Sequence, residues 1–177
     1  MKRIVMLPML AGLALLLVLT AAFAQEIKVK SKGTATASGS GAVKVTVVSG
    51  TLTVTMKGKL LVAPPTVKLT VKGTPGKKTE IKDKKTGKVG GCQYDGFNGT
   101  LTVTGDKYEM LLEGTGIKLN ASGAGQVAFS GTGTYSAASG AKKKTGKWAP
   151  RSTEDYIVTP IPATFGEIEM PKPPAKQ

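Results

Sequence analysis

The sequence predicts an all-β protein, an antiparallel sandwich or barrel of short strands separated by glycine. Apolar and polar residues alternate along most of the chain after residue 24, as in 43–47 and 67–71. A period of two with β-branched residues is typical of strands with one buried and one wet face. Glycines recur between these runs at short intervals, which suits a fold built largely from hairpins.

The first 24 residues have the three parts of a secretory signal. Lys2 and Arg3 precede a long apolar stretch that ends in Ala22-Phe23-Ala24, a small-residue cleavage pattern. A retained membrane anchor is the alternative, because the stretch approaches the roughly 20 residues that span a bilayer. The polar Gln25 that follows favours cleavage, so we expect an exported protein, periplasmic or extracellular, with no transmembrane segment after cleavage.

Residues 25–148 are expected to form a single β-domain. In each alternating run the apolar residues fall on one face of the strand, and that face is expected to line the core. The expected core includes Val45, Val54, Leu69, Val103, Leu119 and Phe129. The hexapeptide Gly-Thr-Leu-Thr-Val-Thr occurs at 50–55 and again at 99–104, as a duplication or as convergence of Thr/Val-rich strands.

A β-solenoid is the alternative fold, since short glycine-punctuated strands can also stack as coils. No constant coil length is visible, and the lysine-rich break at 74–91 would interrupt a stack. The sandwich or barrel is therefore favoured. Residues 149–177 are rich in proline and are expected to form an extended or disordered tail, with 156–158 adding one edge contact and Trp148 covering the core.

A series of turn glycines and aromatic residues fills the second half of the domain: Asp95-Gly96-Phe97-Asn98-Gly99, Gly114-Thr115-Gly116-Ile117, Gly123-Ala124-Gly125, Gly131-Thr132-Gly133-Thr134-Tyr135 and Trp148. This pattern resembles a family of uncharacterised exported bacterial β-proteins. The family has no assigned activity and no assigned binding residues. The resemblance therefore implies no functional residue in this chain.

The usual catalytic and metal-binding side chains are scarce. The chain has no histidine and one cysteine, which removes Ser-His and Cys-His nucleophile arrangements and the familiar zinc sites. The acidic pairs Glu80 with Asp83 and Glu109 with Glu113 are interpreted as solvated surface groups. We therefore predict no catalytic, cofactor or metal residue and a protein that is not an enzyme.

Two further residue groups have a structural and a functional interpretation. Cys92 cannot form an internal disulfide and is expected to be a small buried residue, although Gly90-Gly91 beside it favours exposure. Asp95 and Asn98 offer oxygen atoms of the kind that bind calcium. Their spacing matches no known calcium loop, so a plain turn is expected.

The chain is strongly basic, with 25 Lys and Arg against 11 Asp and Glu. Two runs concentrate the lysines: Lys77, Lys78, Lys82, Lys84, Lys85 and Lys88, then Lys142, Lys143, Lys144 and Lys147. They either keep the protein soluble and protect strand edges from pairing, or form a low-specificity surface for an acidic partner.

The acidic partner expected for these lysines is an anionic envelope or extracellular polymer, or lipid headgroups. Nucleic acid is not expected, because no aromatic stacking residues are interleaved with the lysines. Two other functions stay open from the sequence: a structural or assembly subunit that pairs through strand edges, and a secreted enzyme of unrecognised type. The oligomeric state is open as well.

Overall fold

The computed structural model describes residues 28–84, 86–150 and 163–169, which form eight strands and no helix. The expected signal segment lies outside the described residues. The strands are β1 (Lys28–Ser31), β2 (Gly33–Ala63), β3 (Leu69–Thr74), β4 (Lys77–Lys82), β5 (Val89–Ser139), β6 (Lys142–Lys147), β7 (Ala163–Phe165) and β8 (Glu167–Glu169). The all-β prediction is confirmed, with mainly antiparallel pairing. Two strands are much longer than expected, at 31 residues for β2 and 51 for β5.

These strands form one long hairpin. Its first arm is β2, β3 and β4 in succession, its turn is residues 83–88, and its second arm is β5. The antiparallel register runs from the turn to the far end of both arms. Successive pairs are Lys77 with Asp95, Leu69 with Val103, Val47 with Gly125 and Thr34 with Ala138.

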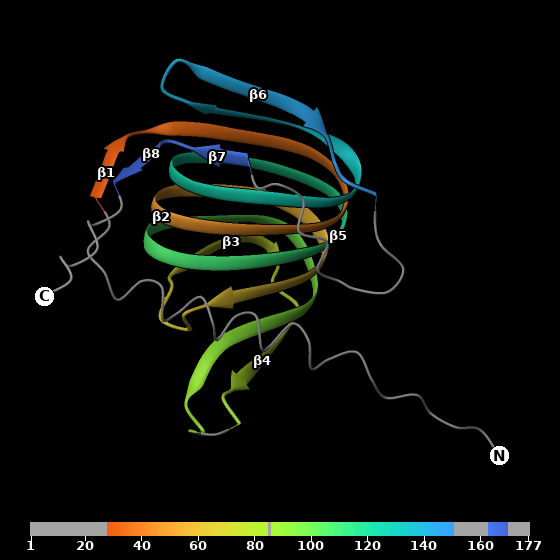
Figure 1. Cartoon of the computed structure of the whole chain (residues 1–177). Helices are drawn as coiled ribbons and strands as arrows, with labels where there is room; N and C mark the ends of the chain where they lie inside the picture. Colours follow the sequence, from red (N-terminus) through yellow and green to blue (C-terminus); the bar gives the residue numbers. More distant parts are fainter. Residues whose placement is uncertain (1–27, 85, 151–162, 170–177) are drawn as a thin grey trace, which may run out of the picture.

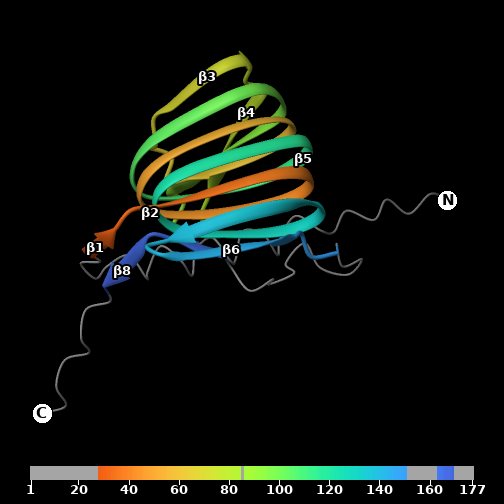
Figure 2. The ribbon, with the colours of Figure 1, turned by 90° about the horizontal axis from the view of Figure 1, so that it is seen from above.

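The hairpin is wound on itself, because each arm also pairs along its other edge. Thr34 pairs with Ala138 across the hairpin and also with Ser122 from the next turn of β5. Figures 1 and 2 show the result, a stack of curved turns in which β2 and β5 alternate. The sheet is not closed into a barrel. The coil resembles the stacked turns of the solenoid alternative, but its neighbouring strands pair antiparallel.

Paired glycines mark the bends of the coil. They face each other across the hairpin as Gly39 with Gly133, Gly41 with Gly131, Gly50 with Gly123, Gly58 with Gly114 and Gly73 with Gly99. A Cβ atom on Gly41 would lie 2.9 Å from the Gly131 Cα, so a side chain on either arm would separate the arms. The interpretation of these glycines as hairpin turns was wrong: they lie at bends inside continuous strands.

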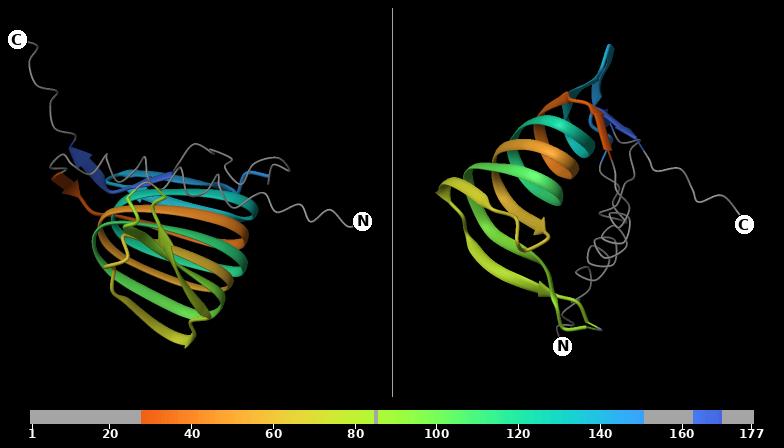
Figure 3. Two further views of the ribbon diagram at one scale, coloured as in Figure 1. Left: turned by 90° about the horizontal axis from the view of Figure 1, so that it is seen from below. Right: turned by 90° about the vertical axis from the view of Figure 1, so that its left-hand side faces the viewer.

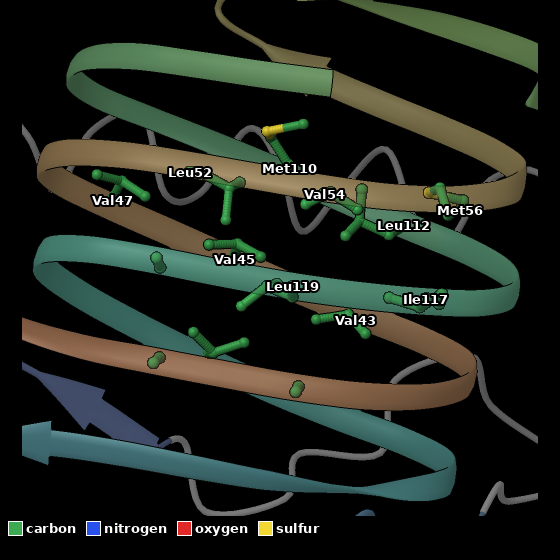
Figure 4. Packing of buried hydrophobic residues seen from close by; sticks show 14 of the residues in the cluster. Val43, Val45, Val47, Leu52, Val54, Met56, Met110, Leu112, Ile117 and Leu119 are labelled. Carbon is green, nitrogen blue, oxygen red and sulfur yellow. The ribbon is translucent and has the colours of Figure 1, made fainter. Parts of the chain in front are cut away.

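The bends divide the coil into two walls that face each other. The first wall contains β3, β6 and segments 34–40, 51–57, 98–104, 116–122 and 134–139. The second wall contains β4, β7 and segments 42–48, 59–63, 91–95, 106–113 and 124–130. Figure 4 shows Val43 to Val47 of the second wall and Leu52 to Met56 of the first, with side chains between the walls.

The side chains between the walls are mostly those that the alternation predicted to be buried. Val45, Val54, Val103, Leu119 and Phe129 are all buried. Leu69 is half-buried and packs against the same cluster. The alternation therefore predicted which face of each strand is buried, although it did not predict how the strands are connected.

Aromatic residues close the end of the coil near β6. Trp148 stacks on Phe129 with ring centroids 5.3 Å apart and donates from Nε1 to the Thr134 carbonyl oxygen at 3.1 Å, which agrees with the expected cover over the core. Phe165 of β7 is fully buried. The domain therefore continues past residue 148, because the short run Ala163–Phe165 pairs with β5. Residues 156–158 lie outside the described part.

Candidate functional site

The two lysine runs lie at opposite ends of the coil. Lys77, Lys78 and Lys82 belong to β4, which pairs with the first residues of β5. Lys142 to Lys144 and Lys147 belong to β6, which pairs with the last residues of β5. Figure 1 shows β4 and β6 at the two ends of the stack. The structure therefore makes two separate cationic surfaces, and Lys85 lies outside the described residues.

Both runs occupy edge strands. Among the described strands β4 and β6 pair only with β5, so each keeps one unpaired edge. An unpaired edge is a template for adding another strand, and lysine is a common protection against it. This geometry fits the expectation that the lysines protect edges. Lys84 and Lys88 lie beyond the end of β4, where there is no strand edge to protect.

We call residues 77–88 the hairpin tip. Its described lysines, at 77, 78, 82, 84 and 88, are all exposed. Asp83 fixes the turn: its Oδ1 accepts hydrogen bonds from the Thr86 backbone N at 2.6 Å and Thr86 Oγ1 at 2.9 Å. Its backbone N donates to the Lys88 carbonyl oxygen at 2.8 Å. These bonds hold the described part of the turn, whose lysines are exposed. Figure 3 shows the ribbon of β4 projecting at one end of the coil.

Lys59 joins the base of the hairpin tip, although no signal in the sequence indicates it. Its Nζ lies 3.9 Å from Asp95 Oδ1, and both side chains are over 40% exposed, at 42% and 43%. In the register Asp95 lies between Lys59 on one edge and Lys77 on the other. An exposed pair at this distance contributes little stability and adds no net charge at the base of the tip.

Asp95 and Asn98 each have other partners in this arrangement. The two Asp95 carboxylate oxygens accept from Gln93 Nε2 at 3.0 and 2.8 Å. Asn98 is exposed and pairs with Lys57 and Thr74. Over the described ranges, no three His, Cys, Asp or Glu side chains are grouped so that they could hold a metal ion.

The expectation that Glu109 is a solvated surface group is wrong. Its side chain is buried, and burial raises the pKa of its carboxyl, while nearby Lys44 and a hydrogen bond from Thr46 act in the opposite direction. Thr46 Oγ1 donates to Glu109 Oε1 at 3.4 Å.

Glu113 is half-buried, and Glu80 is exposed on β4. Glu80 pairs with Cys92 and Glu109 with Thr46 and Ala63, so these acids belong to different strand pairs.

Two buried polar groups lie in or beside the core. Cys92 is 3% exposed, so the interpretation as a small buried residue is confirmed and the exposure favoured by Gly90-Gly91 is wrong. The Tyr108 hydroxyl is buried without a hydrogen-bond partner in the described structure, and burial raises the pKa of Tyr108. Tyr108 follows the apolar phase of its strand, which gives no signal for an unpaired hydroxyl.

Comparisons with protein-family models, curated proteins and solved structures found no match to this chain. The resemblance to exported bacterial β-proteins therefore stays a prediction. The described residues include no helix long and apolar enough to cross a membrane.

Proposed function

We propose that this chain is a non-catalytic exported domain that binds anionic polysaccharide through its hairpin tip. The observation that carries the proposal is the concentration of five exposed lysines in the projecting hairpin tip, with Glu80 and Asp83 as the acids in the same segment. Clustered positive charge raises the local concentration of a polyanion. The Asp83 carboxylate accepts hydrogen bonds from Thr86 within the turn, while the described lysines are exposed.

A flexible anionic polymer fits the tip better than a membrane or a nucleic acid. Residues 77–88 contain no aromatic side chain, so the tip lacks both the stacking platform of single-strand nucleic-acid proteins and the aromatic group of a membrane-surface anchor. Its one large apolar residue, Ile81, is half-buried in β4. Exposed lysines without a stacking or apolar group beside them suit a partner recognised by charge density.

Retention on immobilised dextran sulfate, with neutral dextran as the control surface, tests the proposal. We expect retention at low salt that weakens steeply toward about 0.15 M, where the screening length is about 8 Å. Replacing Lys82, Lys84 and Lys88 with Gln should remove most of it. Replacing Lys142, Lys143 and Lys144 with Gln removes the same charge from the opposite end and should weaken retention less.

Three results would contradict the proposal. They are absence of retention at low salt, equal retention on neutral dextran, and equal loss in the two triple variants. The last result would show that net charge, rather than the tip, attracts the polymer. Retention on phosphatidylserine vesicles with none on dextran sulfate would replace the polymer by a membrane surface.

A further inference from the structure

The outer side of the first wall carries a regular array of neutral polar side chains. Leu52 and Val54 point inward and are fully buried, so the residues between and beside them point outward. The neighbouring segments of this wall show the same alternation of buried inward side chains with half-buried or exposed outward ones. We call the outward residues of four adjacent segments the hydroxyl face: Thr34, Thr36, Ser38, Lys118, Asn120, Ser122, Thr51, Thr53, Thr55, Thr100, Thr102 and Thr104.

The hydroxyl face is ordered in two directions. Across the strands, one line of directly paired residues crosses the whole wall: Thr145, Ser136, Thr36, Asn120, Thr53, Thr102 and Thr70. Along each strand, alternate residues repeat the pattern. Adjacent strands lie about 4.7–4.9 Å apart and alternate residues about 6.5 Å apart. Figure 4 shows the segments carrying Leu52 to Met56 and Ile117 to Leu119 with nearly parallel axes, which keeps the spacing regular.

Hydrogen bonds between neighbouring threonines hold part of this array in place. The hydroxyl oxygens are 3.0 Å apart between Thr51 and Thr104, and 2.8 Å apart between Thr55 and Thr100. Thr53 and Thr102 form the pair between them at 3.4 Å. A β-branched side chain is already stiff at its first torsion. The face is therefore organised before any partner arrives, which lowers the entropy cost of binding.

Charge separates this face from the rest of the surface. Among its twelve residues Lys118 is the single charged side chain and none is acidic. The outer side of the second wall is irregular by comparison, with Lys44, Glu109, Leu111 and Glu113 in adjacent positions. The hydroxyl face therefore fits an uncharged partner, unlike the hairpin tip.

The chemistry of the hydroxyl face excludes a flexible neutral polymer as a strong ligand. Each hydroxyl bond to such a partner replaces a bond to water and gains little. The face also lacks the aromatic side chains that give binding sites most of their buried apolar contact. A favourable free energy of binding requires a rigid, periodic partner. Many weak hydrogen bonds can then form together, and no entropy is lost in ordering the partner.

We propose that the hydroxyl face binds ice. A hydroxyl both donates and accepts hydrogen bonds, as each water in ice does, and ice is uncharged, rigid and periodic. The wall is periodic in two directions as well, with strands about 4.7–4.9 Å apart and alternate residues about 6.5 Å apart. This surface is separate from the hairpin tip and does not depend on anionic polymer binding.

Incorporation into a slowly growing ice hemisphere tests the proposal with the purified protein. We expect wild type to be enriched in the ice fraction, to shape ice crystals into facets and to slow their recrystallisation. Thr53→Tyr places a bulky ring at the centre of the array and should reduce all three effects to the level of buffer. Thr79→Tyr makes the same change at an exposed position on β4 of the second wall and should leave them intact.

Thermal unfolding of each variant shows that the substitutions leave the fold in place. Exclusion of wild type from ice would overturn the proposal, as would an equal loss in Thr79→Tyr. Binding of wild type to crystalline cellulose without entry into ice would also overturn it, because a crystalline saccharide would then be the rigid partner. A wild-type effect lost only in Thr53→Tyr supports it.

Discussion

The hydroxyls of Thr55 and Thr100 lie 2.8 Å apart on neighbouring strands of β2 and β5. Each threonine belongs to one copy of the repeated hexapeptide, at 50–55 and 99–104. The two copies run antiparallel beside each other, with Leu52 opposite Val103 and Val54 opposite Leu101. Identical alternation gives both copies a buried apolar side and an outer threonine side. The repeat therefore forms one half of the hydroxyl face.

Leu119→Ala is expected to destabilise the protein by roughly 2–5 kcal/mol, the usual cost of truncating a buried leucine. Leu119 is 3% exposed between the walls. Urea unfolding measures the change. Asn120→Ala is the control on the outer side of the same strand, expected to stay within about half a kcal/mol of wild type. A loss below that value for Leu119→Ala would place this side chain outside the core.

Gly123→Ala should be strongly destabilising. Gly123 has a φ of 135° and faces Gly50 at a bend, where a new Cβ would collide with the Ser49 carbonyl oxygen. Unfavourable φ alone costs about 1–3 kcal/mol, before the collision is added. Gly90→Ala is the matched control, since its Cβ would meet no atom closer than 3.9 Å. Similar melting temperatures for the two variants would contradict the paired-glycine account of the bends.

Glu109→Gln is expected to change the pH dependence of stability. Burial raises the Glu109 pKa in the folded protein above the ordinary value of 4.5, so the folded state binds the proton more tightly than the unfolded state. Stability contributed by this group is therefore lost as pH rises from about that value through the raised pKa. The Gln variant should lack that loss and be more stable than wild type at neutral pH.

Urea unfolding of wild type and Glu109→Gln over a pH series measures this difference. Glu113→Gln removes a carboxylate from the same side of β5 and serves as the control, with the pH-dependent loss retained. A constant offset between wild type and Glu109→Gln at all pH values would show that the carboxyl is solvated.

The edge position of β6 predicts a change in self-association. Replacing Lys142, Lys143 and Lys144 with Thr removes charge from an unpaired edge and adds strand propensity. We expect oligomers in sedimentation velocity at concentrations where wild type sediments as a smaller species. Replacing Lys44, Lys57 and Lys59 with Thr removes the same charge from β2, where each residue pairs on both edges, and should not promote assembly. Equal behaviour would mean that the lysines act through net charge alone.

The buried phase of most strands could be predicted from local alternation. The connections could not, because a glycine at a bend and a glycine at a hairpin turn interrupt alternation in the same way. One signal of the coil is nevertheless present in the sequence: glycines occur at mirrored positions about residues 83–88, as in Gly41 with Gly131 and Gly58 with Gly114. That symmetry indicates one long hairpin with shared bends.

The surfaces were predicted in part. The two lysine runs are visible in the sequence, but their positions at opposite ends follow from the strand pairing, which sets β4 beside the start of β5 and β6 beside its end. The hydroxyl face needs the second pairing of each arm. Thr36 and Thr53 are far apart in a plain hairpin and become neighbours across Asn120 only when the hairpin coils.

The coil itself is the claim on which the hydroxyl face depends. Nuclear Overhauser contacts across the strands test it directly, because most residues of β2 pair with two segments of β5. Backbone protons of Thr53 are predicted to show contacts with both Thr102 and Asn120. Contacts with Asn120 alone would show a plain hairpin that is not wound on itself, and would contradict both the fold and the hydroxyl face.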